Sequence, residues 1–220
     1  MIKKLFFILT ILIFFCPCVF ATDCSSVPVN PTVKITSSYG KLLYDKTKSI
    51  EEITSLAKKF NLVEKGLFAS GLSTVNVNFD ITINTLGIPV GELEYCVVPT
   101  DVIIFLGLDS PTIYLSKDID KNPCIHDLVL RHEKTHQQIN KTTLEYYLPL
   151  FKEASSRIIK ELKPIKITNI QEIESSTALL TKLYNKKMMS LVDFIKKEMI
   201  NEQKKLDNPE NYNFENSLCK

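Results

Sequence analysis

The most informative part of this 220-residue chain is the run Leu130-Arg131-His132-Glu133-Lys134-Thr135-His136. Its two histidines are four residues apart, so on a helix they lie on one face and both imidazoles can reach one metal ion. Zinc is the metal that such a pair most often binds, with zinc–nitrogen distances of about 2.0–2.1 Å. Glu133 is turned about 100° from His132, where it can reach a zinc-bound water without binding the metal. The run therefore predicts a helix with His132 and His136 as zinc ligands and Glu133 as a general base.

The residues around the motif predict that its helix is buried on the histidine side. Five apolar residues share the face of the two histidines: Ile125, Leu128, Val129, Ile139 and Tyr146. The alternative interpretation is a pair of ordinary buried histidines that hold no metal. The remaining histidine, His126, is turned about 120° from His132, and we expect it to be exposed in the first turn of the helix.

The residues leave the third protein ligand of such a site open. A catalytic zinc site usually takes three protein ligands and a water. No histidine follows His136, so a downstream ligand must be of another residue type. The candidate carboxylates are Glu153, Glu161, Glu172, Glu174 and Glu210. Helix geometry favours Glu174, because it flanks the apolar stripe of a helix that must pack near the two histidines.

The second half of the chain is predicted to be helical. All six glycines lie at or before Gly107, so long helices can form after it without breakers. Asn122-Pro123 is typical of a helix start. We expect helices over 122–147, 150–162 and 168–206, with Pro149 interrupting the first two. Residues 207–220 contain Pro209 and several asparagines, which predicts a tail that forms a loop.

The first half has the composition of strands and turns. Residues 75–83 alternate apolar and polar side chains, which predicts a half-buried strand. Ser49 and Glu52 form a capping box that opens a helix over 49–60. Further strands are expected over 32–39, 93–98, 102–106 and 112–115, and a loop over 85–91. The prediction is a single α+β domain with three parts: a small antiparallel sheet with one helix (22–121), a long-helix half carrying the histidines (122–206) and the tail (207–220).

The N-terminus has the pattern of an export signal. Lys3 and Lys4 precede an apolar run over 5–15, and Val19 and Ala21 suit the positions before a cleavage site. We therefore predict a signal peptide over 1–21 and export of the mature chain to the periplasm or the medium. An uncleaved membrane anchor is the alternative. No second apolar run of spanning length follows, so no stable membrane span is expected after cleavage.

Cysteine content agrees with export. Two of the six cysteines lie in the predicted signal peptide, which leaves Cys24, Cys96, Cys124 and Cys219. An even number of cysteines in an exported chain predicts disulfides. Of the three possible connectivities we expect Cys24–Cys219 with Cys96–Cys124, because the first pair lies near the chain ends and the second near the middle.

Composition bounds the class of protein. The chain is 45% hydrophobic and 24% charged, which is typical of a globular domain and excludes a disordered one. Without Lys3 and Lys4, basic and acidic residues balance at 25 each. This balance argues against a nucleic-acid partner, because nucleic-acid-binding domains usually carry a basic excess.

Residues from about 39 to 212 resemble a bacterial family of predicted secreted zinc-dependent proteases, the domain of unknown function 922 family. The similarity includes Tyr44-Asp45 ahead of the 49–60 helix, the strand over 75–83, Cys96, the histidine motif, and a long helix that ends in Leu206-Asp207. That family closes with a Tyr-Asp-x-x-Thr-x-His-Gly pattern. Asp207 matches its Asp, whereas Leu206, Glu210 and Tyr212 stand where its Tyr, Thr and His would be.

The resemblance implies a zincin-like fold with one zinc per chain, and it moves the expected third ligand to the tail. Glu210 is favoured over Tyr212, because a phenol with a pKa near 10 must lose its proton to bind well. Glu174 remains the alternative. The predicted function is an exported zinc-dependent peptidase, in which Glu133 assists attack of a zinc-bound water on a peptide bond of a peptide or protein substrate. The rival hypothesis is a non-catalytic exported binding or envelope protein on a degenerate zincin scaffold.

Overall fold

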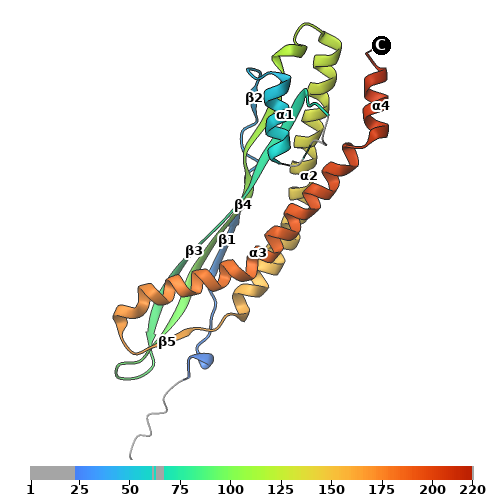
Figure 1. Ribbon diagram of the computed structural model, residues 1–220. Helices are drawn as coiled ribbons and strands as arrows, with labels where there is room; N and C mark the ends of the chain where they lie inside the picture. Colours follow the sequence, from blue (N-terminus) through green and yellow to red (C-terminus); the bar gives the residue numbers. More distant parts are fainter. Residues whose placement is uncertain (1–22, 61, 63–66, 220) are drawn as a thin grey trace, which may run out of the picture.

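A computed structural model describes residues 23–60, 62 and 67–219, and the predicted signal peptide lies outside the described residues. The predicted α+β class is confirmed. One sheet lies beside two long helices, α2 (Pro123–Glu161) and α3 (Ile173–Leu206), and these pack against each other and against the sheet (Figure 1). In the described part of the chain, no helix is both long enough and apolar enough to cross a membrane.

The sheet is built on one long antiparallel hairpin. Strand β3 (Gly71–Pro89) pairs along its length with β4 (Tyr95–Leu115), which places Ile81 opposite Ile104. Two short strands, β1 (Thr32–Thr36) and β2 (Leu43–Asp45), lie parallel to β4 and pair with it. A third short strand, β5 (Ile165–Ile167), pairs antiparallel with the first residues of β4. The sheet is therefore mixed rather than wholly antiparallel, because the direction in which a strand pairs depends on the path of the chain between strands.

Two interruptions predicted in the hairpin are wrong. Gly87 and Pro89 lie inside β3 rather than in a loop, and Pro99 lies inside β4 rather than between two strands. Pro99 cannot donate a hydrogen bond, and it pairs with Thr85 next to an irregularity in the register. Gly87 allows α3 to pack closely, because a Cβ there would lie 2.9 Å from Cδ1 of Ile173.

Two helix starts follow the sequence, whereas the start expected at 168 and the interruption expected at Pro149 do not hold: a 3-10 turn over Ile170–Glu172 precedes α3, which begins at Ile173. Helix α1 (Ile50–Lys59) has the predicted capping box, and α2 begins after Asn122, whose side chain accepts a hydrogen bond from the backbone of Ile125. Helix α2 continues through Pro149 instead of stopping there. Leu144 and Phe151, one on each side of this proline, are both buried in the core, and this packing outweighs the cost of about 3 kcal/mol for proline inside a helix.

The predicted loop at the C-terminus is also a helix in part. Helix α4 (Pro209–Ser217) follows Asn208, whose side chain caps it by accepting a hydrogen bond from the backbone of Asn211. Asn208-Pro209 repeats the signal that starts α2, namely a capping asparagine followed by proline at the first helical position. The prediction of a loop over 207–220 is therefore wrong for Pro209–Ser217, although Asn208-Pro209 is a helix-start signal.

The core lies between α2, α3 and the hairpin. Its fully buried members include Val102, Ile104, Leu106, Leu144, Ile159, Leu180, Tyr184 and Met188. The hydroxyl of Tyr184 on α3 donates a hydrogen bond of 3.1 Å to the carbonyl of Ile159 on α2, so the one polar atom of this large ring is paired. This packing gives α2 a rigid support, and α2 carries the histidine motif.

The presence of two disulfides is confirmed, but the predicted pairing is wrong. Cys24 is joined to Cys96, and Cys124 is joined to Cys219. Because β1 runs parallel to β4, the segment before β1 lies beside the start of β4, and this brings Cys24 to Cys96. Because α3 returns along α2, the end of the chain reaches the first turn of α2. Two disulfides are typical of an exported protein.

Candidate metal site

Helix α2 places the three motif residues inside the protein. His132, Glu133 and His136 expose 6%, 6% and 9% of their surface. The helical spacing aligns the two imidazoles on the side that faces the end of α3, and their rings lie 4.7 Å apart, centre to centre. The predicted inward orientation of both histidines is therefore observed.

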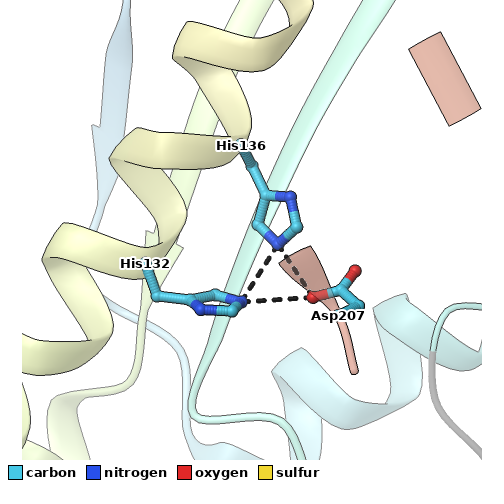
Figure 2. A group of neighbouring side chains, drawn as sticks. All are labelled: His132, His136 and Asp207. Carbon is cyan, nitrogen blue, oxygen red and sulfur yellow. Dashed lines mark hydrogen bonds and ion pairs between the residues drawn. The ribbon is translucent and has the colours of Figure 1, made fainter. Parts of the chain in front are cut away.

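A carboxylate from the end of α3 completes a group of three. Asp207 caps the C-terminus of α3, and its Oδ1 lies 3.2 Å from Nε2 of His132 and 3.1 Å from Nε2 of His136 (Figure 2). The two Nε2 atoms are themselves 3.1 Å apart. Among the described residues, these three form the group of side chains whose ligand atoms are close enough to hold one metal ion.

The spacing of the three atoms suits a tetrahedral zinc ion. Ligand atoms about 2.0–2.1 Å from a tetrahedral ion lie about 3.3–3.4 Å from one another. The three observed separations of 3.1–3.2 Å are close to this value. Two histidines and one carboxylate would leave a fourth position for a water or a substrate atom, which is the usual composition of a catalytic zinc site.

Hydrogen-bond partners on the far side of each ring favour lone pairs on both Nε2 atoms. Nδ1 of His132 lies 3.0 Å from Oε2 of Glu215, and Nδ1 of His136 lies against Oε1 of Gln203. The Gln203 amide is oriented by two bonds from its Nε2, to the carbonyl of His136 and to Oδ1 of Asn140. Since both partners are acceptors, each neutral ring carries its proton on Nδ1. Two bare nitrogens and a carboxylate oxygen then converge, and a cation between them would relieve their mutual repulsion.

Asp207 is suited to binding a cation because it stays ionised. In the absence of a metal ion, burial would lower the pKa of His132 and of His136, but the hydrogen bonds to Asp207 and the nearby carboxylates outweigh it and raise both pKa values. Burial by itself would raise the pKa of Asp207, but the hydrogen bonds from the protonated rings hold it well below its usual range. A bound metal ion would replace these protons and select the neutral rings that carry their proton on Nδ1. An ionised carboxylate is the form that binds metals.

Glu133 lies beside the metal-binding group without belonging to it. Its carboxylate faces the first residue of β3, where a Cβ on Gly71 would lie 2.7 Å from Oε1 of Glu133. Burial raises the pKa of Glu133 to about 7, against the lowering effect of His136 and His132. A buried carboxyl with a pKa near neutrality can both take and return a proton, which is the property that a general base needs.

Tyr212, one of the residues proposed as third ligand, lies in the site but outside the group. Its ring stacks on His132 with centres 5.3 Å apart, and its hydroxyl donates a hydrogen bond of 2.8 Å to Oδ1 of Asp207. Partial removal of the ring from water and the hydrogen bond to the Asp207 carboxylate raise the pKa of Tyr212, so its hydroxyl keeps its proton although the residue is 44% exposed. Tyr212 is therefore placed as a hydrogen-bond donor to Asp207.

The other residues discussed from the sequence lie elsewhere. Glu210 is exposed in the first turn of α4 and is not brought into the group. Glu174 stands 33 residues before Asp207 along α3, which corresponds to about 50 Å of helix. His126 is half-buried rather than exposed, because Nζ of Lys46 lies 3.2 Å from its Nε2.

Three residues of the site were missed by the sequence analysis as functional residues: Asp207, Gln203 and Glu215. The first had a signal, because Asp207 is the residue of the tail that matches the closing pattern of the resembled family. The other two had none, since nothing local distinguishes them from neighbouring solvent-exposed polar residues.

No protein-family model, curated protein or solved structure matches the chain. The functional interpretation therefore rests on the geometry of His132, Glu133, His136 and Asp207.

Proposed function

We propose that this chain is an exported zinc-dependent peptidase. The observation that carries the proposal is the convergence of two Nε2 atoms and one carboxylate oxygen, with separations of 3.1–3.2 Å, beside a buried glutamate that is not part of the group. Zinc hydrolases combine the same parts, namely three protein ligands, an open fourth position and a carboxylate base.

The choice of zinc rests on the donor set and on its surroundings. Two imidazoles and one carboxylate suit zinc, and they also suit ferrous iron, which some enzymes use for oxygen chemistry. Glu133 favours hydrolysis, because a buried base next to the ligands has a direct role in activating water. Metal analysis of the purified protein distinguishes the two ions.

The chemistry assigned to the residues is a hydrolysis. A bound zinc ion would supply Lewis acidity that polarises the scissile carbonyl. Glu133 would take a proton from the attacking water as the new bond from oxygen to the carbonyl carbon forms. It would then give that proton to the amine nitrogen as the carbon–nitrogen bond breaks. His132, His136 and Asp207 would hold the ion, and Tyr212 would steady the Asp207 carboxylate through its hydroxyl.

The proposed location is outside the cytoplasm, in the periplasm or the medium. Two disulfides support this assignment, and so does the signal-peptide pattern over 1–21. The resemblance to predicted secreted zinc-dependent proteases, drawn from the residues alone, points the same way. The expected substrate is a peptide or a protein.

The test combines metal analysis with a cleavage assay on the purified mature chain. We expect about one zinc ion per chain, and loss of most of it in His132→Ala and His136→Ala. Cleavage is best measured by mass spectrometry on a mixed peptide library, since this requires no prior substrate. Glu133→Gln keeps the size of the side chain, so it should retain zinc and lose cleavage.

Each outcome has a distinct meaning. A wild-type chain that holds zinc but cleaves no peptide would favour the non-catalytic binding protein. Full zinc retention in the double variant His132→Ala/His136→Ala would refute the metal site itself. Iron in place of zinc would refute the assignment of zinc, and the cleavage assay would then decide whether the site hydrolyses peptides.

A further inference from the structure

Helix α4 contributes to the metal site but has little packing of its own. It has nine residues, all of them described, and none of its side chains is buried. Its Phe214 is 64% exposed, and Leu218, which follows the last residue of the helix, is 47% exposed. An isolated helix of this length is marginal in water, and helices in proteins normally gain their stability from a buried apolar face. Another interaction must therefore hold α4 in place.

The contacts of α4 lie along one side of the helix. Tyr212, Glu215 and Cys219 are spaced three and four residues apart, so they lie on one face of α4 and its extension. On α2, Cys124 and His132 are separated by eight residues, or about two turns, and share a face. The two faces meet at the Cys124–Cys219 disulfide and at the contact between Glu215 and His132.

The covalent contact is the one that can keep the polar contact in place. The Glu215 side chain is 17% exposed, so docking α4 removes much of its carboxylate from water. Against that cost the carboxylate gains a contact to one imidazole nitrogen, and α4 also contacts the site through the stacking of Tyr212 on His132 and the hydrogen bond of Tyr212 to Asp207. The nine described residues of α4 form no buried apolar face. The Cys124–Cys219 disulfide lies two turns of α2 away and tethers the end of α4 near His132. This tether gives the Glu215 carboxylate a high effective concentration near Nδ1 of His132.

We propose that the Cys124–Cys219 disulfide sets the metal affinity of the site by holding Glu215 against His132. Glu215 acts as a positioning residue: it accepts the Nδ1 proton of His132 and so presents the Nε2 lone pair to the metal. Reduction of the disulfide by two electrons and two protons gives two thiols, frees the end of α4 and removes this partner. Loss of such a partner typically lowers metal affinity 10–100-fold. The inference rests on the metal site of the proposed function but not on catalysis.

The experiment uses zinc alone as the ligand and measures its affinity on the purified mature chain, in competition with a chromophoric chelator. The Cys124→Ser/Cys219→Ser variant should bind zinc about 10–100-fold more weakly than the wild type. Cys24→Ser/Cys96→Ser is the matched control, since that disulfide joins the segment before β1 to the start of β4 and touches no residue of the site. It should bind zinc like the wild type.

A second set of variants tests Glu215 itself. Glu215→Ala should lose affinity about 10–100-fold, and adding it to the serine pair should cause little further loss, because freeing α4 already removes the Glu215 contact. Glu215→Gln keeps an acceptor oxygen and should restore most of the affinity. Nitrogen NMR of the imidazoles in the metal-free chain should show His132 protonated at Nδ1 in the wild type, with this preference weakened in Glu215→Ala.

Reduction of a single bond covers the case in which the serine pair fails to fold. In the Cys24→Ser/Cys96→Ser chain, a water-soluble phosphine can reduce only Cys124–Cys219, and the phosphine becomes its oxide. Zinc affinity should then fall 10–100-fold and recover on reoxidation. Unchanged affinity after reduction overturns the inference, and so does a wild-type affinity in Glu215→Ala. A wild-type chain that binds no zinc at all instead overturns the proposed function.

Discussion

Replacing Asp207 by asparagine is the sharpest test of the metal site. The substitution keeps the shape of the side chain and removes the charge of the oxygen that lies 3.1–3.2 Å from both Nε2 atoms. The matched control is Glu210→Gln, which removes the charge of an exposed carboxylate three residues further along the chain. The family resemblance favours Glu210 as the third ligand, whereas the structure brings Asp207 to the histidines, so the two variants also decide between these assignments.

The expected magnitude follows from the role of each carboxylate. Removing a residue that only orients a ligand costs 10–100-fold in metal affinity, so removing a ligand should cost at least the upper end of this range. A 100-fold loss corresponds to about 2.7 kcal/mol. Glu210→Gln should change the affinity by less than about twofold, which is the size of surface effects within 0.5 kcal/mol.

The assay is competition for zinc against a chromophoric chelator at fixed pH and salt. Circular dichroism and the melting temperature of the metal-free chains should show that both variants are folded. A large loss in Glu210→Gln together with wild-type affinity in Asp207→Asn would refute the assignment of Asp207. Wild-type affinity in both would leave a two-histidine site, for which a catalytic role has little support.

Three further predictions concern the surroundings of the site and the stability of the fold. Gly71→Ala places a Cβ 2.7 Å from Oε1 of Glu133, so peptide cleavage should fall while zinc content stays near that of the wild type. Hydrogen bonds from the side chain of Lys48 and from the side chain and backbone of Thr47 lower the pKa of Asp45 from 3.8 to about 2. The contribution of Asp45 to stability is therefore fully present above pH 3.8 and lost as the pH falls through 2. Asp45→Asn should flatten this acid limb in unfolding curves measured against pH. Among the described side chains, the buried hydroxyl of Ser155 lacks a hydrogen-bond partner. Ser155→Ala should therefore raise the free energy of unfolding by about 1 kcal/mol in a denaturant titration. A clear fall in the free energy of unfolding would contradict this.

Local sequence patterns predicted the parts of the structure that depend on neighbours along the chain. The i, i+4 spacing placed His132 and His136 on one helical face, because 3.6 residues per turn decide that without reference to the rest of the fold. Asn122 and the capping box at Ser49 marked two helix starts, since a cap is completed within four residues. The alternation over 75–83 identified the central part of β3 for the same kind of reason.

Only the tertiary structure decided which distant residues meet. Asp207 reaches the two histidines because α3, with 34 residues, returns along α2 and ends beside the motif, and a helix end can be placed this way only by the packing of its whole length. The same return brings Cys219 to Cys124, whereas the parallel entry of β1 brings Cys24 to Cys96. Pro149 stays helical because the core holds both flanks of α2. Each of these outcomes balances a local preference of a few kcal/mol against burial summed over many residues, and that sum exists only once the chain is folded.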